Sequence, residues 1–270
     1  MFAACNCFSQ DYSICMSQFS TSAILLRRTE YGDYDLILSL FTHLHGKISV
    51  IAKSAKKSSR RFAGILELFS EIDVVVTGGR GLPVLQEAAL KHPFAQIRVV
   101  PSRLAYASYW AELIHDWMED HAEQTELYHL LHHVLNQLDQ GQVPEAVLSI
   151  LFQMRFLRVS GHSPNLERCV VCQRKMPLIR SDVLAVDVAK GGIACPGCLP
   201  SSVDAPRLAK GTVNQLLWVA GGGLNRAARM KFSPAAMVES LAFLERFVPH
   251  HLGRLPRSLK VLRQLRGEDL

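Results

Sequence analysis

Four cysteines of this chain are spaced for metal binding. They form two pairs, each with two intervening residues: Cys169, Cys172, Cys195 and Cys198. Two thiolates at this spacing can face one tetrahedral ion, and two such pairs complete a zinc site with bonds of about 2.3 Å. Gly191-Gly192, just before the second pair, permits the tight turn that such a site needs. Because four thiolates leave no coordination position for water or substrate, we predict one structural Zn²⁺ per chain.

A dense basic segment is the second group of residues that could bind a ligand. No acidic residue lies between Lys47 and Leu66, and the segment holds the candidate DNA-binding residues Lys53, Lys56, Lys57, Arg60 and Arg61. Cations on a loop can follow a phosphate backbone, and each contact adds salt-dependent affinity through counterion release. The adjacent Phe62 could stack on a base, but we expect it to close the end of a barrel. A solvated loop without a ligand is the alternative for the charges.

A second basic segment lies near the C-terminus. Its cations alternate with leucines: Arg254, Arg257, Lys260, Arg263 and Arg266 with Leu255, Leu259, Leu262 and Leu265. On a helix, the leucines would form one buried stripe and the cations a broad opposite face. The pattern predicts a surface for DNA or for the acidic tail of a partner protein, with Arg254, Arg257, Lys260 and Arg263 as candidates. Charge that only solubilises a packed helix is the alternative.

Short apolar runs separated by turn residues predict strands in the N-terminal third of the chain. The expected strands are Ala23–Arg27, Leu36–Thr42, Lys47–Ala52, Ile72–Thr77 and Leu82–Glu87, with turns at His45-Gly46 and at 78–81. Five short strands suit a small closed barrel, of which the oligonucleotide-binding (OB) fold is the commonest five-stranded type. An SH3-like barrel fits the pattern nearly as well.

After Pro93 the apolar spacing becomes helical. Helices are expected at 104–117, 127–138, 144–159, 209–220, 234–247 and 255–266, and the loop-rich stretch 162–206 holds the cysteines. We therefore predict an α+β chain in which a five-stranded OB-fold β-barrel precedes an α-helical domain with an inserted four-cysteine zinc finger. The predicted bounds are a candidate disordered extension at 1–20, the barrel at 21–92, the helical domain at 93–270 and the zinc-finger module at 165–200.

Composition and charge fit a globular protein that binds a polyanion. Of the 270 residues, 49% are hydrophobic and 20% are charged. The net charge of +6 is uneven: it is +4 over residues 1–103, −8 over 104–154, where no Lys or Arg occurs, and +10 over 155–270. This alternation predicts basic faces for a polyanion and one acidic face, unless the acids only solvate a helix pair.

Cysteine usage and missing motifs limit the class of protein. An odd count of 7 cysteines argues against a secreted disulfide framework. The first twenty residues hold no Lys or Arg and no long apolar run, so we expect a cytoplasmic protein without a membrane segment. No P-loop, GxGxxG, GxSxG or HExxH motif occurs, so no enzyme is predicted. A zinc deaminase would use His121 and Glu123, but Arg168 stands where its motif has proline.

Several segments resemble the RecO family of recombination mediators. The stretch SAILLRRTEYGDYDLILSLFTHLHGKISVIAKSAKKSSRRFAGILELFSEIDVVV resembles that family's N-terminal barrel, and LPVLQEA resembles the closing strand. ASYWAELIHDWMED resembles its first long helix, FQMRFLRVSGHSPNLERCVVC with GGIACPGC its zinc module, and HLGRLPRSLKVLRQL its C-terminal segment. One departure is Ser54, where the basic loop of the family usually has glycine.

The resemblance implies a non-enzymatic protein of DNA repair and homologous recombination. Such a protein binds single- and double-stranded DNA and anneals complementary strands. With RecR it helps load RecA onto strands coated by single-strand-binding protein, whose acidic C-terminal tail it also binds. By the match, Lys53, Lys56, Lys57, Arg60 and Arg61 form the DNA-binding loop. The alternative is another zinc-ribbon nucleic-acid-binding protein or a zinc-dependent nucleic-acid enzyme.

Overall fold

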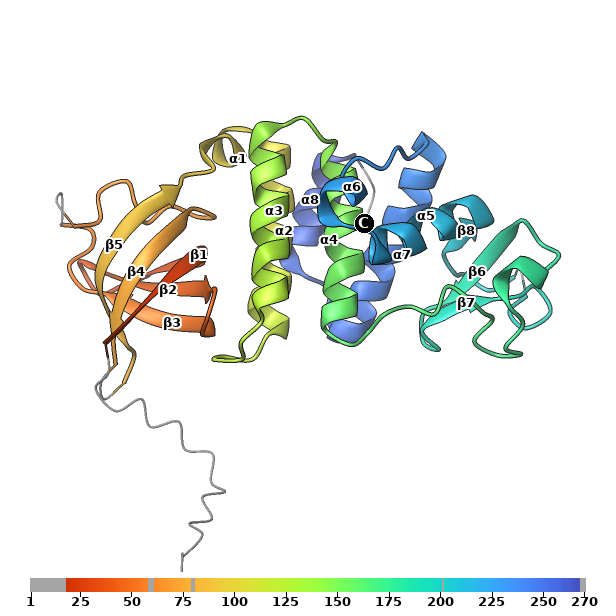
Figure 1. Ribbon diagram of the computed structural model, residues 1–270, viewed down its shortest axis with the longest axis horizontal. Helices are drawn as coiled ribbons and strands as arrows, with labels where there is room; N and C mark the ends of the chain where they lie inside the picture. Colours follow the sequence, from red (N-terminus) through yellow and green to blue (C-terminus); the bar gives the residue numbers. More distant parts are fainter. Residues whose placement is uncertain (1–17, 58–60, 79–80, 201, 268–270) are drawn as a thin grey trace, which may run out of the picture.

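The computed structural model describes residues 18–57, 61–78, 81–200 and 202–267. A β-barrel, a layer of helices and a small sheet follow one another along the long axis of the molecule (Figure 1). The predicted α+β class, with a five-stranded barrel before the helices, is confirmed. The predicted extension at 1–20 falls outside the described residues, apart from residues 18–20, which begin the first strand.

The barrel closes through hydrogen-bonded strands in the order β1-β2-β3-β5-β4, with β4 pairing back onto β1. Its strands are β1 (Gln18–Tyr31), β2 (Asp35–Thr42), β3 (Gly46–Ala52), β4 (Glu71–Thr77) and β5 (Val84–His92). Buried residues alternate with half-buried ones along β3, which is the period expected of a strand with one face in a core. This arrangement fits the predicted OB-fold.

The turn predicted at His45-Gly46 is present and requires glycine. Gly46 has a φ of +62°, and a Cβ there would collide with the carbonyl oxygen of Ala122 in the connection that follows the second helix. The Thr42 hydroxyl donates to the Gly46 carbonyl at 2.8 Å and closes the turn. The turn between β2 and β3 therefore packs closely against the helical region.

Eight helices occur among the described residues, and capping residues of the sequence mark some of their ends. Ser233 accepts a hydrogen bond from the Ala236 amide at 3.2 Å, and Gly141 ends a helix with a φ of +67°. The helices are α1 (Ala95–Val99), α2 (Pro101–Trp117), α3 (Thr125–Gln140), α4 (Glu145–Val159), α5 (Lys210–Gly221), α6 (Leu224–Ala227), α7 (Pro234–Leu252) and α8 (Arg257–Leu265).

One hydrophobic core joins the barrel to the helices. Phe41 of β2 and Phe69, which precedes β4, belong to the same buried cluster as Trp110 of α2 and Tyr128 of α3. The Phe41 and Tyr128 ring centroids are 6.0 Å apart. The proposed division between residues 92 and 93 falls between β5 and α1, and because the core spans this junction the domain bounds stay a prediction.

A small three-stranded sheet forms from two strands within the loop-rich stretch 162–206 and one strand just after it. Its strands are β6 (Val183–Asp187), β7 (Gly192–Ala194) and β8 (Arg207–Ala209), in the order β7-β6-β8, and a 3-10 turn, η1 (Met176–Leu178), precedes them. This sheet lies at the end of the molecule opposite the barrel (Figure 1). Within the described residues, we find no helix with the length and apolar content needed to cross a membrane.

Candidate metal centre and nucleic-acid interface

The two cysteine pairs come together beside the small sheet. The four sulfur atoms all lie within 4.8 Å of one another, and Cys172 Sγ is 3.7 Å from Cys195 Sγ. A tetrahedral ion with bonds of about 2.3 Å places its sulfur ligands roughly 3.8 Å apart. Cys169 is buried and Cys198 is half-buried, so the cluster is partly enclosed by protein. The cysteines therefore fit one structural metal site.

Backbone contacts hold the two halves of this site together. Val170 donates to the Ile193 carbonyl at 2.9 Å, and the Cys195 amide donates to Cys169 Sγ at 3.4 Å. A Cβ on Gly192 would collide with the carbonyl oxygen of Asn165, so only glycine permits this approach. Gly191 precedes it with a φ of +77°, in agreement with the predicted tight turn.

The thiols of the cluster differ in acidity. Burial opposes ionisation of Cys169, but backbone N–H groups, those of Cys172 and Cys195 first, lower its pKa. The neighbouring sulfurs, above all that of Cys195, raise the pKa of Cys198 by hydrogen bonding. Ionising all four thiols together is therefore unfavourable without a cation, and a divalent metal ion would favour the four thiolates.

The basic loop follows β3 on the rim of the barrel. Its backbone is held by the Lys56 amide, which donates to the Tyr34 carbonyl at 3.0 Å, and by the Ser54 amide, which donates to Asp35 Oδ1 at 2.7 Å. Ser54 has a φ of +55°, in the left-handed region that glycine adopts without strain. The position where the sequence resemblance implied a glycine therefore has a glycine-like conformation, stabilised by the Asp35 carboxylate.

The cations of the loop have different surroundings. Lys53 is exposed, Lys56 Nζ lies 2.8 Å from Glu30 Oε2, and Lys57 Nζ lies 3.4 Å from the centroid of the Tyr34 ring. Arg61 donates to the carbonyls of Leu85 and Gln86 at 3.4 and 3.0 Å. The remaining candidate, Arg60, lies outside the described residues. Lys56 and Lys57 border an open cavity of about 450 Å³ that Arg28 and Leu66 also line.

Two tyrosines beside this loop are binding candidates that sequence reasoning missed. Phe62, the aromatic residue considered for base stacking, is 4% exposed in the barrel core, in agreement with the expectation that it closes the barrel end. Tyr31 and Tyr34 are instead 55% and 44% exposed where β1 turns into β2. The signal available was their position on either side of Gly32, because a turn carries its side chains outward.

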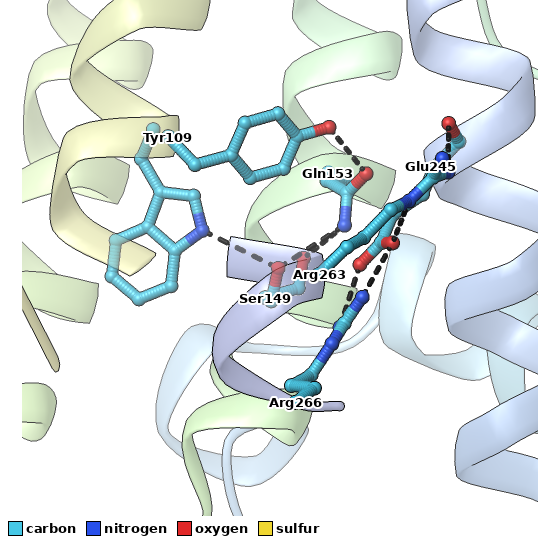
Figure 2. Close-up of polar contacts among 7 residues, drawn as sticks. Tyr109, Ser149, Gln153, Glu245, Arg263 and Arg266 are labelled. Carbon is cyan, nitrogen blue, oxygen red and sulfur yellow. Dashed lines mark hydrogen bonds and ion pairs between the residues drawn. The ribbon is translucent and has the colours of Figure 1, made fainter. Parts of the chain in front are cut away.

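The C-terminal basic segment differs from the predicted continuous face. Arg263 and Arg266 point inward to Glu245 of α7, which is 2% exposed, with Arg266 N–H groups 2.8 and 2.7 Å from its carboxylate oxygens (Figure 2). Arg263 Nε lies 3.3 Å from Glu245 Oε2. Arg263 is therefore not part of the candidate surface for DNA or a partner's tail, because its guanidinium neutralises a buried carboxylate.

Only part of that segment remains available to a ligand. Arg254 is 58% exposed but pairs with Asp116, whereas no ion pair joins Arg257 or Lys260 to another described residue. The predicted leucine stripe is also shorter than expected: Leu259 and Leu262 are buried, and Leu255 and Leu265 are exposed. Arg257 and Lys260, with Arg254 beside them, are the reduced candidate surface.

The structure argues against the zinc deaminase alternative. His121, expected on a solvated helix face, is exposed in the connection between α2 and α3, and its amide donates to the Lys47 carbonyl of the barrel at 2.9 Å. The cysteines lie beyond the helical layer at the opposite end of the molecule (Figure 1). His121 and Glu123 therefore cannot act on an ion held by the cysteines.

Comparison with known proteins identifies the family. The pattern described as "Recombination protein O N terminal" matches residues 16–94, and "Recombination protein O C terminal" matches residues 99–260. The chain is 45% identical to the DNA repair protein RecO of Desulfosudis oleivorans over 93% of this chain and 99% of the relative. It is 43% identical to that of Desulfatibacillum aliphaticivorans, over 93% of this chain and 98% of the relative. The resemblance seen in the sequence is thus confirmed, and the chain belongs to the RecO family of DNA repair proteins.

Proposed function

We propose that this protein is a recombination mediator that binds DNA and anneals complementary single strands without catalysing a covalent change. The observation that carries the proposal is the basic rim of the OB-type barrel, where the loop that holds Lys53, Lys56 and Lys57 places Lys57 over the exposed Tyr34. OB-folds that bind single strands combine a cationic groove, which follows phosphates, with aromatic rings on which bases stack. This rim has both components within one turn and one loop.

A single strand would follow the rim with its phosphates toward the lysines. Lys57 lies over the Tyr34 ring, so a phosphate and a base could be bound by adjacent side chains. Contacts of this kind do not read base edges, and the complementary edges of a bound strand stay free to pair. Annealing would follow because the protein offsets the repulsion between two phosphate backbones.

The four cysteines are proposed to hold one structural Zn²⁺. The ion would hold together the two halves of the module at 165–200, far from the barrel rim (Figure 1). A closed four-thiolate shell supplies folding free energy rather than an activated water molecule. The proposal therefore assigns the metal to stability and not to strand annealing.

Protein partners are proposed from family membership. We expect the chain to act in the cytoplasm with RecR, to bind the acidic C-terminal tail of single-strand-binding protein, and so to assist RecA loading. Arg257 and Lys260 support a site for that tail, because they are exposed cations without an intramolecular ion pair among the described residues. Double-stranded DNA would bind the same basic surfaces through phosphate contacts.

The test is annealing of two complementary oligonucleotides, one carrying a fluorophore and the other a quencher, without nucleotide. The wild-type protein should increase the pairing rate, and denaturing gels should show both strands intact. Prior coating of the strands with single-strand-binding protein tests the partner: annealing should persist with the full-length partner and decline when its acidic tail is deleted. No rate increase on bare strands would contradict the proposed annealing, and cleaved or deaminated strands would contradict a non-catalytic role.

A further inference from the structure

A second group of metal-ligating side chains lies where the barrel meets α3, far from the cysteines. Glu71 begins β4 and is 5% exposed, and its Oε2 lies 3.2 Å from His132 Nε2 and 3.7 Å from His92 Nε2. The ligand atoms of the three residues all lie within 4.8 Å of one another. One carboxylate oxygen therefore faces two imidazole nitrogens from different elements.

A β-bulge and an aromatic ring position the two imidazoles. Glu71 pairs with His92 whereas Ile72 pairs with Leu90, so Lys91 is an extra residue in β5 and the strand bends there. Phe94, which is 4% exposed, lies against both imidazoles, with ring centroids 5.8 Å from His92 and 5.7 Å from His132. The orientation of the two histidines is therefore set by packing.

The other carboxylate oxygen of Glu71 already has its own partners. The Tyr128 hydroxyl donates to Oε1 at 2.9 Å, and Lys91 Nζ lies 3.6 Å from the same atom. Lys91 is shared with Asp73 Oδ1 at 3.7 Å and with the Ser22 hydroxyl at 3.1 Å, which offsets its charge near the site. Contacts of this type orient a carboxylate ligand and leave its second oxygen toward the imidazoles.

We propose that Glu71, His92 and His132 bind one divalent transition-metal ion, separate from the four-cysteine site. An ion with bonds of about 2.0–2.1 Å to nitrogen and oxygen in tetrahedral geometry places its ligands roughly 3.4 Å apart, between the two separations observed. Two imidazoles and a carboxylate are ligands that Zn²⁺, Co²⁺ and Ni²⁺ accept. His92 is 55% exposed, so the remaining coordination position opens to solvent.

The bound ion would act as a clamp between the barrel and the helices. Its ligands come from the start of β4, the end of β5 and the middle of α3. Fixing these three elements to one ion restricts motion of the barrel relative to α3. The expected consequence is a higher melting temperature when the metal is present, because the ion binds the folded protein only.

The test uses the full-length protein with its four-cysteine site filled by Zn²⁺, titrated with Co²⁺. The wild type should bind one further equivalent, with the visible bands of cobalt held by nitrogen and oxygen and without a thiolate-to-cobalt charge-transfer band. His92→Asn, His132→Asn and Glu71→Gln should each weaken this binding by at least about 10-fold. His129→Asn is the matched control, because His129 lies one turn earlier on α3, where its Nε2 is 3.3 Å from His43 Nε2.

A melting curve with and without Co²⁺ is the second readout. The wild type and His129→Asn should show the same rise in Tm, and the three ligand variants should show none while keeping the far-ultraviolet circular dichroism of the wild type. Three results would overturn the proposal: no further equivalent bound by the wild type, loss of binding in His129→Asn but not in His132→Asn, or a charge-transfer band from thiolate.

Discussion

Replacing Lys53, Lys56 and Lys57 together by alanine is expected to weaken single-stranded DNA binding in a salt-dependent way. Each phosphate contact contributes about 0.7 to the slope of log affinity against log salt, so three contacts contribute roughly 2. Between about 50 mM and 200 mM salt, the affinity ratio of wild type to variant should therefore shrink by about 20-fold. The barrel should remain folded, since the three lysines lie in a surface loop outside the barrel core.

The surroundings of each lysine set this magnitude. Lys56 must leave Glu30 or share it with a phosphate, and a surface ion pair is worth only about 0–1 kcal/mol, which a phosphate contact can replace. If Lys56 stays with Glu30, the slope should change by about 1.4 instead. Glu30→Gln should then raise DNA affinity, because it releases Lys56. Arg61 is left in place, since it donates to barrel carbonyls.

The assay is fluorescence anisotropy of a labelled oligonucleotide across a salt series. A control variant removes the same charge from exposed cations around α6, on the helical layer: Arg226, Arg229 and Lys231, each replaced by alanine. Its slope should match the wild type. An unchanged slope in the loop variant would refute the assignment of the loop, and an equal decrease in both variants would indicate a long-range charge effect rather than phosphate contact. Loss for one DNA sequence only would indicate base readout.

Three further predictions concern stability. Cys172→Ser should lose the bound zinc in elemental analysis and lower Tm, yet anneal strands at the wild-type rate while folded; loss of annealing in the folded variant would assign the metal a direct role. Arg266→Ala should cost about 3 kcal/mol in denaturant unfolding because it leaves buried Glu245 with only the longer ion pair to Arg263, whereas Arg254→Ala should cost below about 1 kcal/mol. Burial opposes ionisation of Glu112, but hydrogen bonds from the start of α8 lower its pKa overall. The ionised carboxylate therefore stabilises the folded protein at neutral pH, and this stabilisation is lost as pH falls. Glu112→Gln should be less stable than wild type at pH 7, with the difference vanishing in acid melts.

Local patterns in the sequence predicted the elements well. The strand expected at Leu36–Thr42 is observed as Asp35–Thr42, because a short apolar run between turn residues is a pattern contained within one segment. The helix expected to begin near Pro144 is observed as Glu145–Val159. The cysteine cluster was also predictable, since each pair of ligands is adjacent in the chain. Features that depend on residue spacing within one segment could therefore be predicted from the sequence.

Features that depend on contacts between distant segments were not predicted. On a helical projection Arg263 belongs to an outer face, yet it turns to Glu245, a carboxylate buried on another helix. The strands of the small sheet were missed because β7 and β8 have only three residues each, too few for a period to appear. The Glu71 cluster joins residues from three elements and has no sequence pattern at all.

The acidic stretch between Arg103 and Arg155 forms ion pairs and hydrogen bonds that join elements of the fold, rather than a separate acidic face. Its carboxylates reach both basic regions of the sequence: Asp120 pairs with Lys47 of the barrel, Asp116 with Arg254, and Glu126 with Arg158, while Glu112 accepts from the first amides of α8. Part of the alternating charge of the chain is thus neutralised by ion pairs within the molecule. Lys53 on the barrel and Arg257 with Lys260 on α8 are exposed, and no ion pair joins them to another described residue, so they can contact phosphate or an acidic tail. Salt that screens those exposed charges should weaken DNA binding well before it loosens partly buried pairs such as that of Asp116, whose side chain is 12% exposed.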